Sequence, residues 1–229
     1  MQNVAVLTGA GISAESGLKT FRDSDGLWEN YHVDDVATYQ AWKKKTDLVR
    51  NFYNERRKQL FSASPNEAHK QLVRLENKFN VQIITQNVDD LHERAGSTKV
   101  LHLHGELKKL VSETDPFEIV TLKDWKQTPD MKDKSGYPLR PFIVWFGEPV
   151  PMIEPAIKIC QKADILLVIG TSLNVYPAAG LIHYCSNQCK KYLIDPQETN
   201  GGIPNGFIFV KDVATKGVKQ VVEELLIQN

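Results

Sequence analysis

Short apolar segments alternate with helical patterns along most of the chain, and this alternation restricts the fold more than any other feature of the sequence. Ile165–Ile169 is apolar at every position, as a central parallel strand covered by helices on both faces must be. The other apolar segments are Val4–Leu7, Val81–Thr85, Tyr192–Ile194 and Phe207–Val210. This order of strands and helices predicts an α/β fold with a doubly wound, parallel, Rossmann-like sheet.

Two helices between or after these strands can be placed from their patterns. In the first, Ser64 is the expected N-cap, Pro65 the first helical residue and Glu67 the partner in a capping box. In the second, at the end of the chain, apolar residues form one stripe that we expect to cover the sheet. They are Val218, Val221, Val222, Leu225 and Leu226.

Two segments break the alternation and predict a smaller inserted lobe. Residues 30–63 have a charged helical pattern without a strand, and residues 108–140 are polar with little periodicity. We therefore expect one domain over residues 1–229, with a large Rossmann-like lobe at about 1–29, 64–107 and 141–229. The small lobe is then formed by about 30–63 and 108–140, and a ligand cleft is expected between the lobes.

Charge and cysteine content limit the class of protein. The 28 basic and 28 acidic residues balance, so no overall field favours nucleic acid or an anionic membrane. No export signal and no apolar run of about 20 residues is evident. Three cysteines are too few and too clustered for a disulfide framework. We expect a soluble, cytoplasmic monomer.

The first strand runs into a glycine turn. Gly9, Gly11 and Ala14 have the spacing G-x-G-x-x-G/A, which suits a dinucleotide phosphate at the start of a helix. A tight turn without a ligand is the alternative. A dehydrogenase would next show a strand ending in an acidic residue about 20 positions on. Here a polar loop with a glycine follows, which favours a lid over a cofactor and argues against hydride transfer.

The segment TQNVDDLHERAG follows the strand that ends at Thr85. Gln86, Asn87 and Asp89 therefore lie at a strand's carboxyl end, where doubly wound sheets bind ligands. An Asn and an Asp two positions apart can hold a carboxamide, one side chain donating and the other accepting. Alternatively, Asp89 or Asp90 only caps the following helix.

Two histidines in VLHLHGEL have the alternation of a strand. His102 and His104 should point the same way, and Gly105 marks a turn that presents His104 to a cleft. His104 could be a general base, because imidazole titrates near neutral pH. A metal pair and a structural histidine are the alternatives, although no third ligand has convincing spacing.

The segment GTSLNVYPAAG follows the strand Ile165–Ile169. Its Gly170, Thr171 and Ser172 again lie at a strand's carboxyl end, and their small side chains and free amides suit a phosphate or a ribose.

Taken together, GAGISAESGLKTFR, TQNVDDLHERAG, HLHGEL, VWFGE and GTSLNVYPAAG resemble, in order and spacing, the motifs of the sirtuins, the NAD-dependent protein-lysine deacylases. The likeness runs from about Val4 to the last helix, and it is strongest to the bacterial class III type. The resemblance implies that NAD is consumed: nicotinamide leaves, and the acyl group of a protein lysine passes to ADP-ribose.

The resemblance also assigns roles to residues. It implies that His104 is the general base and that Asn87 takes part in catalysis. It places Val144, Trp145, Phe146 and Gly147 against the acyl-lysine substrate. The family often has Asn where Leu193 stands. The implied NAD-binding residues are Gly9, Ala10, Gly11, Glu15, Thr20, Phe21, Arg22, Trp28, Gln86, Asn87, Asp89, Gly170, Thr171, Ser172, Leu193, Asp195 and Ala214.

Tyr53 and Arg56 match the Tyr-x-x-Arg pair associated with acidic acyl groups in class III members. Positions i and i+3 share a helix face, so the two side chains could converge on one carboxylate. The resemblance thus implies malonyl-, succinyl- or glutaryl-lysine as substrates beside acetyl-lysine. The alternative is a surface helix in which Arg56 or Arg57 pairs with Glu55 or solvent.

The chain departs from the family in one respect. Sirtuins commonly carry a structural zinc on four cysteines, but residues 107–148 contain neither cysteine nor histidine. Cys185 and Cys189 have the i, i+4 spacing of a helix, and two thiols do not complete a tetrahedral site. We predict no zinc, and packing in its place by Phe117, Ile119, Val120, Leu122 and Trp125.

Two other functions remain open for this scaffold. One is protein mono-ADP-ribosylation, and the other is a non-catalytic module that binds NAD or ADP-ribose. A dehydrogenase fits least, because no acidic ribose ligand follows the first helix.

Overall fold

The computed structural model describes residues 1–19, 27–28, 31–199 and 201–228. Its large lobe is built on a six-stranded sheet in which every pair of neighbours is parallel. The order is β11 (Phe207–Val210), β10 (Lys190–Ile194), β9 (Ile165–Ile169), β1 (Asn3–Thr8), β4 (Asn80–Thr85) and β5 (Val100–His102). The predicted α/β fold with a parallel sheet is confirmed.

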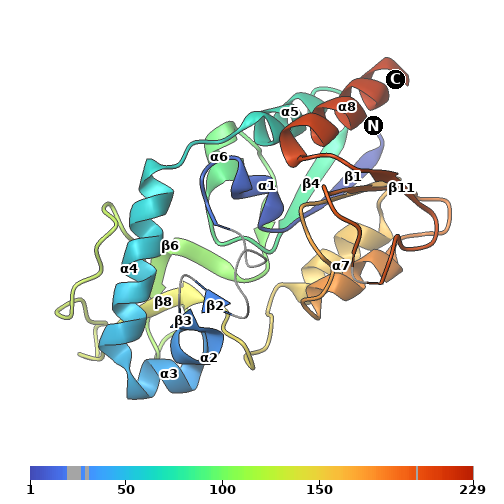
Figure 1. Ribbon diagram of the computed structural model, residues 1–229. Coiled ribbons are helices and arrows are strands. Elements are labelled where there is room, and N and C mark those ends of the chain that lie inside the picture. The colour runs from blue at the N-terminus through green and yellow to red at the C-terminus, as the bar shows by residue number, and fades with distance from the viewer. Residues whose placement is uncertain (20–26, 29–30, 200, 229) are drawn as a thin grey trace.

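Helices cover both faces of this sheet (Figure 1). On one face, α5 (Glu67–Leu75) and α8 (Ala214–Gln228) bury Leu72 and Val218 against β1 and β4. On the other, α7 (Ile153–Gln161) and the 3-10 helix η1 (Ala178–Tyr184) pack against β9. The predicted apolar stripe of the last helix is confirmed, since Val218, Val221, Val222 and Leu225 are buried in this core.

The predicted cap of α5 is wrong. The helix begins at Glu67, and its N-cap is Asn66, not Ser64. Asn66 Oδ1 accepts the Ala68 N–H at 3.0 Å, and its Nδ2 donates to the carbonyl of Ile12 at 2.7 Å. The second bond ties α5 to α1 (Gly11–Ala14), so a tertiary contact selects the capping residue.

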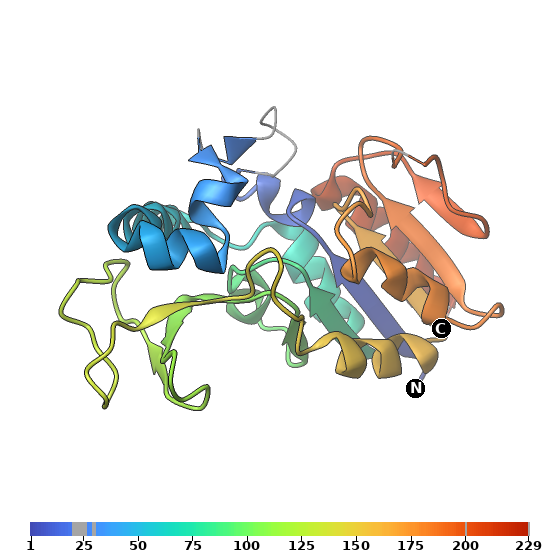
Figure 2. The same cartoon turned by 90° about the horizontal axis from the view of Figure 1, so that it is seen from below.

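The small lobe contains its own antiparallel sheet, in the order β7 (Ile119–Thr121), β6 (Gly105–Val111) and β8 (Arg140–Ile143). Figure 2 shows this lobe beside the large one, with both chain termini in the large lobe. The lobe also holds α2 (Val33–Val36), α3 (Tyr39–Lys44) and α4 (Thr46–Ser62), together with the short pair β2 (Leu27–Trp28) and β3 (Tyr31–His32). The expectation of a segment without a strand at 30–63 was wrong, because β3 lies within it, and the segment of little periodicity at 108–140 contributes β7. In the large lobe, the short helix α6 (Leu91–Ala95) lies between β4 and β5.

The segment without cysteines is held by a small core and a turn built on one carboxylate. Leu110, Leu122 and Leu139 are buried together. Asp133 accepts the Ser112 hydroxyl at 2.6 Å and the backbone N–H of Tyr137 at 2.9 Å. Of the five residues predicted to pack here, Leu122 alone is buried; Phe117, Ile119 and Val120 are exposed and Trp125 is half-buried.

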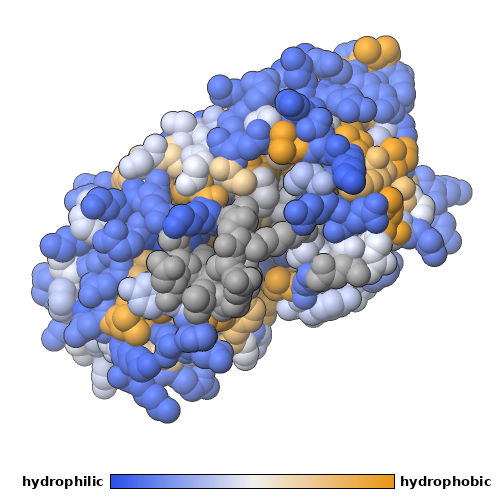
Figure 3. Space-filling view, in the orientation of Figure 1, coloured by the Kyte–Doolittle hydropathy of each residue, from blue (hydrophilic) through white to orange (hydrophobic). Residues whose placement is uncertain are grey.

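Three further observations bear on earlier expectations. Cys160, Cys185 and Cys189 are buried free thiols, and Cys185 follows η1 instead of sharing a helix with Cys189. Within the described ranges, no helix has the length and apolar character needed to cross a membrane. The face of the molecule in Figure 3 is mostly hydrophilic, with scattered apolar patches.

Candidate active site

A cleft of about 580 Å³ lies where the two lobes meet. It is lined by the turn after β1, the loops after β4, β9 and β10, and residues of α4 and the small sheet. Parallel sheets bind ligands outside the carboxyl ends of their strands, and these loops occupy that edge. A volume in this range suits a small-molecule ligand.

The glycine turn is fixed against the loop after β9. Gly11 N–H donates to the Gly170 carbonyl at 2.9 Å, and Gly9 N–H donates to that of Ile169 at the same distance. A Cβ on Gly11 would lie 2.6 Å from Gly170 Cα, and one on Gly9 would lie 2.7 Å from Gly170 O. The glycines are therefore required by this backbone contact itself, which brings Gly170–Ser172 beside the turn at the edge of the cleft.

The loop after β4 places an amide and a carboxylate side by side. Asn87 Nδ2 donates to the carbonyl of Gly9 at 3.1 Å and to Ser13 Oγ at 3.3 Å. Ser13 Oγ in turn donates to Asp89 Oδ2 at 3.0 Å. Ser13 was not predicted as a site residue, although its position four residues after Gly9 on the same turn was a usable signal.

Asp89 is 6% exposed and lines the cleft. Burial raises the pKa of its carboxyl, while bonds from the Leu91 N–H and the Ser13 hydroxyl act in the opposite direction. Asp89 Oδ1 accepts the N–H of Leu91, the first residue of α6, while Asp90 occupies the N-cap position and makes no side-chain capping bond. The alternative that these residues only cap the helix is therefore wrong for Asp89, which also bonds Ser13. One oxygen serves the helix and the other faces the Asn87–Ser13 cluster.

His104 lies on the cleft wall with a defined tautomer. Its Nδ1 is 2.9 Å from the carbonyl oxygen of Gln86, which can only accept, so Nδ1 carries the hydrogen. The lone pair is then on Nε2. Burial lowers the pKa of His104, so the ring is neutral at neutral pH. A neutral imidazole with a fixed donor and an available acceptor is what a general base requires.

His102 makes no metal pair with His104. Its Nδ1 bonds the carbonyl of Asn87 and its Nε2 bonds Glu93, so both ring nitrogens are occupied. The two histidines bond neighbouring carbonyls of one loop, those of Asn87 and Gln86, although the strand ends at His102 and only His104 lines the cleft. No cluster of three metal-ligating side chains occurs in the part of the chain that the structure describes.

The small lobe contributes a second polar group to the cleft. Tyr53 on α4 is fully buried, and its Oη accepts the Trp145 Nε1–H at 2.8 Å. Trp145 is held in turn by Glu148, which accepts its backbone N–H at 2.8 Å. Arg140 forms two hydrogen bonds to Glu148 and lies 3.8 Å from the centre of the Trp145 ring. Burial raises the pKa of Tyr53, so the phenol stays protonated.

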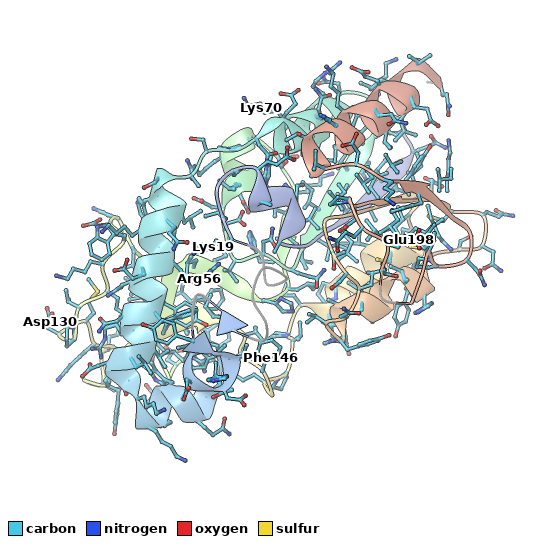
Figure 4. The ribbon with its side chains drawn as sticks, viewed as in Figure 1. Lys19, Arg56, Lys70, Asp130, Phe146 and Glu198 are labelled. Carbon is cyan, nitrogen blue, oxygen red and sulfur yellow. The ribbon has the colours of Figure 1, made fainter. Side chains whose placement is uncertain are left out.

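Arg56 leaves α4 on its inner side, toward Lys19 and Phe146 (Figure 4), and lines the cleft with Tyr53. Arg57 behaves differently. It is buried and donates to Trp125 O at 2.9 Å and to Asn54 Oδ1 at 2.7 Å, and burial lowers its pKa to about 10. The surface-helix alternative therefore fails for Arg57, which binds α4 to the segment around Trp125 within the small lobe.

The comparisons with known proteins agree with this geometry. A sequence profile of the Sir2 family matches residues 9–177. This chain belongs to the Sir2 family. It is 52% identical to an NAD-dependent protein deacylase of Bacteroides thetaiotaomicron, covering 99% of both chains. It is 48% identical to an NAD-dependent protein deacylase of Helicobacter pylori, covering 99% of this chain and 98% of that one.

Solved structures of Sir2 homologues have the same fold as this chain. A Sir2 homologue in complex with NAD is 36% identical, with a TM-score of 0.88, covering 99% of this chain and 90% of that one. An ADP-ribose complex of a Sir2 homologue mutant has a TM-score of 0.90 at the same identity and covers 92% of that chain. The chain is thus an enzyme of the Sir2 family, with the Rossmann-like sheet and small lobe of that fold.

In this Sir2 enzyme most predicted site residues line one cleft. Leu193 does not: its side chain is fully buried against the α7 face of the sheet, and it is Asp195, two residues later, that reaches the cleft. Thr20, Phe21 and Arg22 lie outside the described residues, as does the side chain of Trp28. The predicted residues that do line the cleft are Gly9, Ala10, Gly11, Glu15, Tyr53, Arg56, Gln86, Asn87, Asp89, His104, Val144, Trp145, Phe146, Gly147, Gly170, Thr171, Ser172, Asp195 and Ala214.

Proposed function

We propose that this chain is an NAD-dependent protein-lysine deacylase that transfers the acyl group to ADP-ribose and releases nicotinamide. The observation that carries the proposal is the cleft that His104, Asn87 and Asp89 line together with the glycine turn. The relatives named NAD-dependent protein deacylases support it.

The donor set of the cleft suits NAD. Among the described residues, no group donates a hydrogen bond to Asn87 Oδ1, which leaves this oxygen to accept from a carboxamide. Thr171, Ser172 and Asp195 offer hydroxyl and carboxylate groups for ribose hydroxyls. When bound, NAD supplies a ribose carbon whose bond to nicotinamide can be broken by the acyl oxygen of the substrate.

The protein's own part is orientation and proton transfer. Asn87 and Asp89 would hold the carboxamide of NAD. His104 takes a proton from a ribose hydroxyl at Nε2, since Nδ1–H is retained by Gln86. We further propose that the small lobe needs no zinc, which is supported by the Asp133 turn. We also propose a cytoplasmic monomer acting on acylated protein lysines.

The substrate class proposed within this function includes acidic acyl groups. Because Trp145 donates to Tyr53 Oη, the hydroxyl hydrogen of Tyr53 is left to donate elsewhere. Arg56 adds guanidinium donors on the same side of α4 and has no acceptor. A phenol donor beside a guanidinium is suited to a carboxylate, so malonyl-, succinyl- and glutaryl-lysine fit beside acetyl-lysine.

The test is nicotinamide release from NAD with acetylated and succinylated versions of one peptide. Both peptides should stimulate release. Arg56→Met should lower kcat/KM for the succinyl peptide by about 10- to 100-fold, the value of a charge-assisted hydrogen bond. An unchanged desuccinylation rate in Arg56→Met would exclude the acidic-acyl pocket. ADP-ribose attached to protein, detected by mass spectrometry, would instead indicate a mono-ADP-ribosyltransferase. Binding of NAD without turnover would indicate a non-catalytic module.

A further inference from the structure

We propose that His102 is a positioning residue: by holding the Asn87 carbonyl it fixes the loop that binds nicotinamide, without touching the ligand. This inference rests on the proposed function, because it concerns the same cleft. His102 belongs to β5 and is not among the residues that line the cleft, whereas Asn87, Asp89 and His104 are.

Both ring nitrogens of His102 face acceptors. Nδ1 lies 3.1 Å from the carbonyl oxygen of Asn87, and Nε2 lies 2.8 Å from Glu93 Oε1. A carbonyl and a carboxylate can only accept, so both nitrogens must donate, and the imidazolium form alone satisfies both bonds. The His102 side chain is 8% exposed, whereas that of Glu93 is 40% exposed, so the bond to Asn87 is the more sheltered of the two.

The bond to His102 completes the fixation of Asn87. Its backbone N–H donates to Thr85 Oγ1 at 3.0 Å, and its side-chain Nδ2 donates to the Gly9 carbonyl at 3.1 Å. The carbonyl is the remaining polar group of its backbone, and it belongs to the peptide that leads to Val88 and Asp89. Freeing it allows that peptide to rotate, which would displace Asn87 and Asp89 together.

The charges around His102 favour its cationic form. Burial lowers the pKa of His102, but Glu93 on α6, the Asn87 carbonyl and Glu106 on β6 outweigh burial, so the pKa is raised. The buried Asp89 also benefits, because the positive charge of His102 acts against the effect of burial on its carboxyl. His92, a further titratable neighbour, is kept neutral by burial, and Lys109 acts electrostatically on Glu93.

This arrangement predicts how the pocket responds to pH. When His102 loses a proton, the remaining hydrogen stays on Nε2, since Glu93 is the stronger acceptor, and the Asn87 carbonyl loses its donor. Positioning is therefore complete below the raised pKa of His102 and is lost as the pH rises through it. The pH dependence of His104 has the opposite sign: it acts as a base only when neutral, so its contribution is lost as the pH falls.

Two substitutions separate the two bonds of the ring. In His102→Asn the amide nitrogen occupies the place of Nδ1 and can still donate to Asn87, whereas in His102→Gln it occupies the place of Nε2 and can donate only to Glu93. We expect His102→Gln to raise the inhibition constant of nicotinamide and the KM for NAD by about tenfold, and His102→Asn to change them by less than about threefold. In the unsubstituted protein the inhibition constant of nicotinamide should rise at alkaline pH as His102 loses its proton. His102→Asn should flatten this alkaline limb of the plot of inhibition constant against pH.

Controls make the outcome decisive. His183→Asn, the same change at an exposed histidine of η1, should leave all constants unchanged. A purely structural role would lower the Tm of both variants and affect their inhibition constants equally, which would overturn the proposal. Should the variants not fold, Glu93→Gln provides a second test, because the Glu93 side chain is 40% exposed. Without this carboxylate the pKa of His102 falls, so the alkaline limb must move to lower pH. An unmoved limb refutes the proposal. Absence of nicotinamide release from the unmodified protein would refute the proposed function itself.

Discussion

Replacing Tyr53 by Phe removes one hydroxyl that serves both stability and acyl selectivity. In the native structure this oxygen accepts the Trp145 indole N–H at 2.8 Å, and both side chains are at most 2% exposed. Tyr53→Phe therefore leaves a buried donor without its acceptor, which costs about 1–3 kcal/mol. For a chain of this length each kcal/mol lowers Tm by about 2–4 °C, so we expect a decrease of about 2–12 °C.

The functional effect should be separable from this destabilisation. The hydroxyl hydrogen is one of the donors proposed for an acyl carboxylate, so its loss should lower desuccinylation by about 10-fold or more relative to deacetylation. The assay is kcat/KM for matched acetyl and succinyl peptides, measured well below the Tm of the variant. The ratio of the two constants cancels any loss of folded protein.

A double variant provides the control. Replacing both Tyr53 and Trp145 by Phe removes both hydrogen-bonding partners, so the double variant should lose less stability than the sum of the two single variants. If Tyr53→Phe lowers Tm but leaves the ratio of desuccinylation to deacetylation unchanged, the hydroxyl has a structural role only and the reasoning is refuted.

Three further outcomes are expected. Since burial lowers the pKa of His104, activity should persist as the pH falls through the ordinary histidine range and decline only below it. His104→Ala should reduce kcat by about 100- to 10,000-fold. A pH–rate profile of both proteins checks these two expectations. Gly11→Ala should lower Tm by several degrees and weaken NAD binding measured by calorimetry, because its Cβ would be placed 2.6 Å from Gly170 Cα; unaltered NAD affinity would contradict the assigned turn. Prolonged treatment with a zinc chelator should change neither Tm nor activity, and a loss of either would disprove the zinc-free small lobe.

The large lobe was predictable because its determinants are local. Ile165–Ile169 is apolar throughout because both of its faces are covered, and the glycine turn and the polar residues after β4 and β9 are consecutive in sequence. Their convergence on one cleft follows from the parallel sheet, in which these strands end at the same edge.

What was missed depends on contacts between distant residues. The N-cap of α5 is chosen by the bond from Asn66 to Ile12, which no local pattern reveals. The small sheet pairs β6 with β8 across some 30 intervening residues of polar sequence. Leu193 was expected at the ligand from the family pattern, but strand alternation turns it into the core, and Asp195 reaches the cleft instead.

The most direct test of the account is the product balance of a single reaction. The folded protein is mixed with NAD and an acetylated or succinylated lysine peptide, and nicotinamide, free peptide lysine and acyl-ADP-ribose are quantified over time by mass spectrometry. The account predicts that the three products form in equal amounts and that His104→Ala yields almost none of the acyl-ADP-ribose. Nicotinamide formed without removal of the acyl group, or no nicotinamide at all, would contradict it.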